Sequence, residues 1–256
     1  MATRGFEVTT GLVIQQGIWE DSSTAKHKLG TRMQLADGRV FYYALNGAVA
    51  GVAGTLAECL PAVAGHYNVN CSAAAIGDQS INVTITSTAA TANQYAEGYL
   101  HVQDGTGEGH YYKIKSNTAA SASGTVTVTL YDPIRVATVA SGTSEVSMTY
   151  NPYYKLVKSA TVTNMVVGIY NYVVTASYYF WTQTWGPAVV LGSAAISAVG
   201  EPLAVHTTDG SVGYNYQAIT SQAEVDIRFA YERVGVALGQ ITVSEEYTPI
   251  FLKINC

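Results

Sequence analysis

The sequence predicts an all-β protein made of antiparallel β-sandwich or barrel domains, with an extended N-terminal arm and little helix. Three observations support this fold class: several segments alternate β-branched and polar residues, Gly-containing turn dipeptides separate them, and helix signals are scarce. A chain of 256 residues accommodates one large all-β domain or two domains of ordinary size. A core of that size needs neither a disulfide nor a metal ion for stability.

The strand signals are clearest in two segments. Ser80–Ser87 places Ile81, Val83 and Ile85 on one face and polar residues on the other, and Thr125–Leu130 repeats this pattern. Strict alternation of this kind is typical of a half-buried antiparallel strand. Further expected strands are Arg39–Leu45, Tyr99–Gln103, His110–Lys115, Glu145–Thr149, Tyr170–Thr184, Glu224–Tyr231 and Thr248–Ile254. The turn dipeptides between strands include Asp37-Gly38, Asp104-Gly105, Ser123-Gly124, Ser141-Gly142 and Asp209-Gly210.

Helix signals are confined to one short segment, Gly54–Pro61. Thr55 is placed to cap a first turn, Glu58 completes a capping box three residues later, and Pro61 ends the segment. We therefore expect a short helical turn there and no longer helix.

The pattern divides the chain into three parts. Residues 1–64 are expected to form the N-terminal arm, a first strand and the short helical turn. Residues 65–160 carry the cleanest alternating strands and are expected to form a β-rich domain that protrudes or folds alone. Residues 161–256 are expected to form a C-terminal β-sandwich or barrel rich in Tyr.

The charge of the chain bears on its partners. Charged residues make up 12% of the sequence, while 48% are hydrophobic, and the net charge is −5 without any cluster of Lys or Arg. Binding to a phosphate backbone requires several basic side chains on one face, so we expect no nucleic-acid binding. A surface poor in charge is typical of protein interfaces and indicates a homo-oligomer, although a Thr-rich β protein that does not assemble has the same composition.

The N-terminal segment and the cysteines bear on location. Residues 1–13 lack the apolar core of a signal peptide, and the apolar stretch Ala44–Ala64 is interrupted by polar residues, so we expect no membrane span. Cys59, Cys71 and Cys256 show no metal-ligand spacing. A Cys59–Cys71 bridge is geometrically allowed, but we favour reduced thiols.

A search for catalytic motifs predicts that the protein is not an enzyme and has no cofactor. The sequence contains no Gly-x-Ser-x-Gly elbow and no cysteine in a recognisable catalytic context. His206 lies three residues before Asp209, but we interpret this pair as a strand end followed by an Asp-Gly turn.

One local cluster has the residue types of a cation site. His101, Asp104, Glu108 and His110 lie within ten residues of one another, in a spacing that fits neither zinc nor EF-hand patterns. The favoured interpretation is a glycine-rich β-hairpin in which Gly105, Gly107 and Gly109 supply positive φ angles.

Aromatic residues are abundant, with 19 Tyr, 3 Trp and 5 Phe. The run from Tyr178 to Trp185 places aromatic side chains on both faces of a strand. One face can line a core, and we expect the other to contact a neighbouring subunit, because interfaces are enriched in Tyr and Trp. A platform on which carbohydrates stack is the alternative.

Three segments resemble virion structural proteins of tailed phages. Leu29–Ala44 contains a Leu-Gly-Thr turn followed by Asp-Gly-Arg-x-Phe-x-Tyr, and Tyr179–Ala188 is similar to a Phe-Trp-x-Gln-x-x-Gly segment. Asp209–Val212, Arg233–Leu238 and Pro249–Ile254 resemble the last hairpins of capsid decoration proteins. Interface residues expected from the first two segments are Arg32, Arg39, Phe41, Tyr43, Tyr179, Trp181, Gln183 and Trp185.

The resemblance implies a decoration or cement protein. Such a protein is β-rich, often trimeric, and lies on the capsid surface, where it ties neighbouring major capsid protein subunits together. It would be assembled in the host bacterial cytoplasm. The alternatives are a structural protein of the tail, baseplate or fibre, and a carbohydrate-binding β-sandwich on the virion surface.

Overall fold

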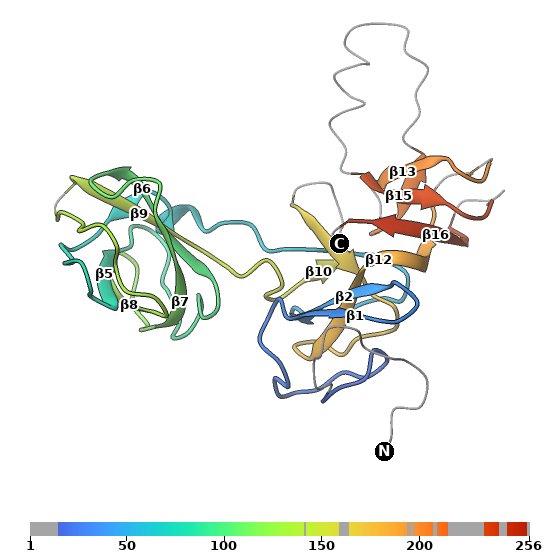
Figure 1. Cartoon of the computed structure of the whole chain (residues 1–256), viewed down its shortest axis with the longest axis horizontal. Coiled ribbons are helices and arrows are strands. Elements are labelled where there is room, and N and C mark those ends of the chain that lie inside the picture. The colour runs from blue at the N-terminus through green and yellow to red at the C-terminus, as the bar shows by residue number, and fades with distance from the viewer. Residues whose placement is uncertain are drawn as a thin grey trace, which may run out of the picture. The chain divides into compact units, whose positions relative to one another are not determined.

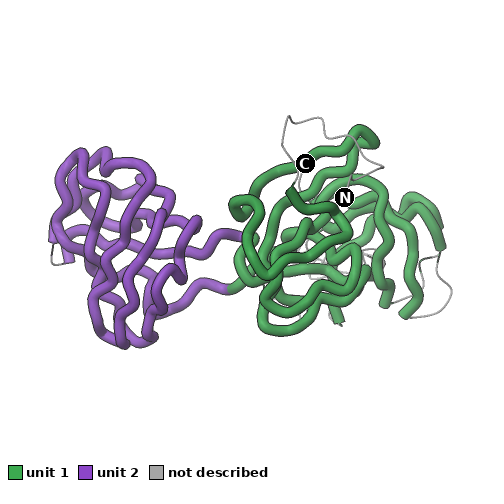
Figure 2. The backbone as a smooth tube through the Cα atoms, turned by 90° about the horizontal axis from the view of Figure 1, so that it is seen from below, with its two compact units in different colours: residues 1–60, 153–256 green, residues 61–152 purple. Residues whose placement is uncertain are grey.

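The computed structural model describes residues 15–140, 142–158, 164–193, 196, 198–206, 209–214, 233–240 and 245–254. The predicted fold class is confirmed, because 46% of the residues are in strands and 1% in helix. The chain divides into two compact units, unit 1 from residues 1–60 and 153–256 and unit 2 from residues 61–152 (Figure 2). Unit 2 is thus an insertion within unit 1.

Unit 1 is built on a ten-stranded sheet that curves as a half-barrel. Its strands are β1 (Arg32–Gln34), β2 (Val40–Leu45), β3 (Leu56–Glu58), β10 (Val157–Lys158), β11 (Val166–Ile169), β12 (Tyr179–Leu191), β13 (Pro202–Val205), β14 (Val212–Tyr214), β15 (Arg233–Ala237) and β16 (Tyr247–Lys253). They are ordered β10-β3-β11-β12-β16-β15-β13-β14, and β2 pairs with both β1 and β12.

Strand β12 organises this sheet. Its first half, from Tyr179, pairs with β2, and its second half, from Trp185 to Leu191, pairs with β16 (Figure 1). The register shifts between Gln183 and Trp185, where β12 passes from one partner to the other. Segments from both ends of the chain therefore meet on one long strand.

The expected division into three parts differs from this arrangement. The strands of residues 15–60 pair with β11 and β12, so the first and third parts belong to the same unit. The first 14 residues of the expected arm lie outside the described residues, as does the expected strand Glu224–Tyr231.

The prediction of a short helical turn at Gly54–Pro61 was wrong. Leu56–Glu58 is strand β3, paired with β10 and β11. The Thr55 hydroxyl donates backwards to the Val52 carbonyl at 2.8 Å, so it closes a turn and does not cap a helix. Leu56 and Ala57 are fully buried, which shows that tertiary pairing outweighed the local capping pattern.

Unit 2 is a six-stranded, nearly closed barrel. Its strands are β4 (Val69–Asn70), β5 (Ser80–Thr84), β6 (Tyr99–Gly105), β7 (Tyr111–Asn117), β8 (Thr125–Leu130) and β9 (Ser144–Thr149), in the order β4-β9-β6-β7-β8-β5. A bridge between Cys71 and Val83 joins the two ends of this order. A 3₁₀ turn, η1 (Ala64–His66), precedes β4.

The alternating segments fill the interior of this barrel. Ile81, Val83 and Ile85 are buried in its core, whereas Asn82 and Thr84 between them are exposed. Val126, Val128 and Leu130 of β8 are buried in the same core. Among the described residues, no helix is long and apolar enough to cross a membrane.

Candidate functional site

Strands β2 and β12 separate two aromatic cores in unit 1. Phe180 of β12 packs with Tyr170 on one side of the sheet, with their rings stacked 5.2 Å apart. Trp181 packs on the opposite side with Tyr43 of β2, edge to face at 5.0 Å. Consecutive residues of a strand point to opposite faces, so the two-sided aromatic run buries aromatic rings on both faces of the sheet.

The N-terminal segment covers the second of these faces. Ile18 lies in the same core as Trp181, and the Trp181 indole N–H donates to the Gln16 carbonyl at 2.9 Å. The Gln16 side chain accepts from the Tyr43 hydroxyl at 2.7 Å and donates to the Tyr179 carbonyl at 2.8 Å. The chain itself supplies the cover that the sequence pattern assigned to a neighbouring subunit.

Four of the expected interface residues are therefore corrected to core positions. Phe41, Tyr43 and Trp181 are fully buried and Gln183 is nearly so, because sheet pairing and the N-terminal segment enclose them. Arg32, Arg39, Tyr179 and Trp185 are partly exposed. Arg39 forms an ion pair of 2.7 Å with Asp37 of the predicted Asp-Gly turn. Desolvation raises the pKa of the Asp37 carboxyl, but the hydrogen bonds and the charge of Arg39 outweigh it, so the pKa is lowered.

A buried asparagine that the sequence patterns did not single out joins two surface loops, and Asp21 attaches a third to them through the Thr175 amide. Asn46 donates to the carbonyls of Val49, Val174 and Thr175 at 3.0–3.3 Å. The side-chain carbonyl oxygen of Asn46 accepts a hydrogen bond from the Tyr170 hydroxyl at 2.9 Å. We call residues 19–21, 46–51 and 171–177 the Asn46 loop cluster.

The Asn46 loop cluster presents exposed apolar side chains on a fixed backbone. Trp19, Val49 and Val173 are 59%, 79% and 67% exposed. The Trp19 ring lies 6.3 Å from that of Tyr172, and the Asp21 carboxylate accepts from the Thr175 amide at 2.8 Å. Large exposed apolar side chains close together are typical of surfaces that bind another macromolecule.

The hairpin between β6 and β7 has the predicted glycine geometry. Gly105, Gly107 and Gly109 have φ angles of 77°, 92° and 80°. Its His and acidic residues do not converge: the Asp104 carboxylate accepts from the adjacent Gly105 amide, and the His110 ring contacts the Gly107 carbonyl.

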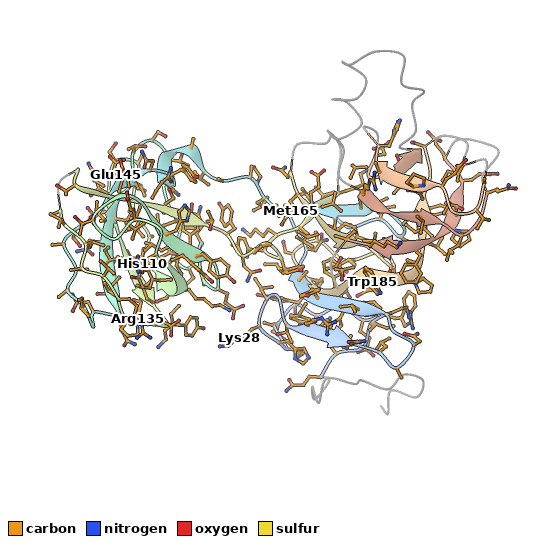
Figure 3. The ribbon with its side chains drawn as sticks, turned by 45° about the horizontal axis from the view of Figure 1, so that its top comes forward. Lys28, His110, Arg135, Glu145, Met165 and Trp185 are labelled. Atoms are coloured by element: carbon orange, nitrogen blue, oxygen red, sulfur yellow. The ribbon has the colours of Figure 1, made fainter. Side chains whose placement is uncertain are left out.

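No group of three or more His, Cys, Asp or Glu side chains that could hold a metal ion occurs in the described part of the chain. Figure 3 shows His110 and Glu145 apart on unit 2. The cross-strand partner of Asp104 on β9 is Glu145, another acidic residue and not one of the two histidines of the predicted cluster. The His101 ring packs edge to face on Tyr67. His101, Asp104, Glu108 and His110 are therefore better described as parts of a structural hairpin.

Unit 1 also contains a cavity of about 340 Å³. It is lined by Val52, Thr55, Lys158, Leu191, Gly192, Ser193, Asp209, Ser211, Glu245 and Tyr247. Lys158 and Asp209 form an ion pair of 3.0 Å at its wall, so the carboxylate that the sequence places near His206 binds a lysine. The described residues of the lining include no histidine or cysteine.

The two described cysteines, Cys59 and Cys71, are not joined in a disulfide and lie in different units. Cys71 is buried in the barrel core, and burial raises the pKa of its thiol. Its Sγ donates to the Ser144 carbonyl at 3.4 Å. Since the thiolate is the reactive form, these features protect Cys71 from alkylation.

We expect Cys71 to stay unmodified by iodoacetamide in the native protein and to react fully in denaturant. Cys59, which is only partly buried, should react in the native state. Peptide mass spectrometry after timed labelling distinguishes the two sites. Rapid native labelling of Cys71 would contradict the closed barrel core.

Comparison with protein-family models, curated proteins and solved structures finds no match to this chain.

Proposed function

We propose that this chain is a phage capsid decoration protein that binds the lattice of the major capsid protein and stabilises the head by burying surface. The observation that carries the proposal is the placement of the three segments that resemble virion proteins. Strands β2, β12, β16 and β15, which contain most of those segments, are neighbours in the sheet of unit 1. The resemblance thus applies to one contiguous piece of structure.

The inserted barrel fits the same proposal. Residues 61–152 form their own core and contain none of the segments that resemble virion proteins. In this proposal unit 1 attaches to the shell, and the inserted unit 2 has a separate role. Attachment would require no chemistry, only complementary surface and symmetric, multivalent contacts.

The Asn46 loop cluster is the proposed contact with the capsid. Its exposed Trp and Val side chains offer apolar area, and its cross-tied loops lose little conformational entropy on binding. Such preorganised aromatic anchors carry a large share of binding energy in protein interfaces.

The proposal is tested by mixing the purified protein with heads and tails from its phage, and imaging both by electron cryomicroscopy. We expect regular density on heads, and mass photometry of the free protein should show an oligomer, with a trimer favoured. Density on tails alone would replace the proposal with a tail, baseplate or fibre role. A monomer that decorates neither particle would refute it.

Replacing the exposed apolar side chains of the loop cluster should weaken attachment without unfolding the protein. The variant Trp19→Ser/Val49→Ser/Val173→Ser should lower head occupancy at least about tenfold, because anchor residues each contribute roughly 1–2 kcal/mol. Val189→Ser/Val199→Ser removes two exposed valines elsewhere on unit 1, 53% and 63% exposed. This control should bind like the wild type. Co-sedimentation with heads measures both, and equal losses would contradict the assigned contact.

A further inference from the structure

The outer surface of unit 2 carries four adjacent aromatic rings that the proposed capsid attachment does not use. They are Tyr67, just before β4, Tyr99 and His101 of β6, and Tyr111 of β7, and we call them the aromatic face. Tyr111 is 70% exposed and Tyr67 is 43% exposed. Tyr99 and His101 are partly buried beneath and beside them.

Strand pairing makes these rings neighbours. His101 is directly opposite Tyr111 in the β6–β7 register, and Tyr99 is two residues from His101 on the same side of β6. The Tyr99 and Tyr111 rings are 6.0 Å apart, and those of Tyr67 and His101 are 5.9 Å apart, both edge to face. Edge-to-face contacts restrain the rings against each other, so the face is ordered before a ligand arrives.

The same alternation that fills the barrel forces these rings outward. Leu100 and Val102 of β6, and Tyr112 and Ile114 of β7, point into the core. The residues between them must face out because successive side chains of a strand alternate. The outward positions of β6, β7 and β9 are Tyr99, His101, Gln103, Tyr111, Lys113, Lys115, Glu145, Ser147 and Thr149.

Polar groups lie beside the rings at the outward positions of β6, β7 and β9. Lys113 and Thr149 lie on either side of Tyr99 in the sheet, and the Ser147 hydroxyl donates to the Gln103 side chain beside His101. Burial lowers the pKa of the His101 ring, which favours its uncharged form. The face combines flat apolar rings with the exposed Gln103 amide and the partly exposed Thr149 hydroxyl and Lys113 ammonium group, whereas Ser147 is fully buried beneath it.

This combination matches one class of ligand. A pyranose ring presents an apolar C–H face that stacks on an aromatic ring, while its hydroxyls point sideways to polar groups. A nucleic acid would require several basic side chains around the rings, and the outward positions of β6, β7 and β9 hold two, Lys113 and Lys115, together with the acidic Glu145. A protein interface is depleted of Lys and Glu at its core, whereas the outward positions of these three strands include Lys113, Lys115 and Glu145.

We propose that the aromatic face of unit 2 binds neutral oligosaccharides by stacking sugar rings on Tyr67 and Tyr111. The inference is independent of the capsid proposal, because it concerns the inserted barrel and not the loops of unit 1. It assigns unit 2 the recognition of a glycan.

The test uses the full-length protein on an array of neutral and acidic oligosaccharides, and affinity electrophoresis through gels containing dextran, soluble starch or glycol chitin. We expect binding to at least one neutral saccharide, followed by calorimetry with that saccharide. Tyr111→Ala and Tyr67→Ala should each weaken it roughly tenfold. Ile76→Ala, which removes a side chain of the same unit that is also 70% exposed, should bind as the wild type.

Two further variants separate stacking from general apolar contact. Tyr111→Phe keeps the ring and should retain most of the affinity, whereas Tyr111→Leu keeps apolar volume and should lose as much as Tyr111→Ala. Circular dichroism verifies that each variant is folded. The proposal is overturned if the wild type binds no saccharide, if only acidic saccharides bind, or if Tyr111→Leu binds as well as Tyr111→Phe.

Discussion

Trp181→Ala is expected to lower the free energy of unfolding of unit 1 by about 3–5 kcal/mol, the range for truncating a fully buried Trp. Trp181 is fully buried and joins the sheet to the N-terminal segment through its hydrogen bond to the Gln16 carbonyl. Its removal leaves a cavity against Tyr43 and an unpaired buried carbonyl. The cavity and the unpaired carbonyl both lower the free energy of unfolding.

Chemical denaturation followed by circular dichroism and Trp fluorescence measures this loss. Trp19→Ala is the matched control, since Trp19 is 59% exposed, and it should change stability by no more than about 0.5 kcal/mol. The core of unit 2 shares no residue with that of Trp181, so Cys71 labelling in denaturant should show its unfolding unchanged. A stability loss in Trp19→Ala equal to that in Trp181→Ala would contradict the burial of Trp181 beneath the N-terminal segment of unit 1.

The barrel of unit 2 was the most predictable part of the fold. Strands β5 and β8 alternate strictly, and in a small barrel each inward residue meets the core, so the local pattern and the tertiary environment agree. Ile81, Val83, Val126 and Val128 were assigned to a buried face from spacing alone and are buried. The glycines of the β6–β7 hairpin were predictable for the same reason, because the turn itself demands positive φ.

Unit 1 was harder to predict because its determinants are long-range. Nothing local in Leu56–Glu58 outweighs a capping box, and only pairing with β10 and β11 makes it a strand. Asn46 shows no signal in the sequence beyond being a polar residue in an apolar stretch. Its role depends on carbonyls more than 120 residues away.

The aromatic run illustrates how a correct pattern led to a wrong assignment. Rings on both faces of β12 do require two covers, as the sequence indicated. The pattern does not specify whether a second molecule or the same chain supplies the second cover. Here Gln16 and Ile18 of the same chain supply the second cover. The surface left for a partner is formed by side chains that strand periodicity does not identify, such as Trp19.

Gly105 of the β6–β7 hairpin lies so close to the backbone of Thr143 that replacing it is expected to be strongly destabilising. A Cβ atom on Gly105 would lie 1.4 Å from the Thr143 carbonyl oxygen, and φ at this residue is +77°. Gly105→Ala must therefore both adopt a left-handed conformation and displace the paired strand β9. We expect unit 2 to lose about 2–5 kcal/mol of stability from the two effects.

Gly109→Ala separates the two causes within the same hairpin. Its φ is +80°, but nothing lies within 4 Å of its Cβ position, so only the conformational penalty of about 1–2 kcal/mol applies. Urea denaturation of the two variants, with Cys71 labelling as the probe of unit 2, compares them directly. The excess loss in Gly105→Ala measures the cost of separating β6 from β9. Equal losses would mean that the close approach to Thr143 relaxes freely, and that the register Gly105–Ser144 does not hold the end of the hairpin in place.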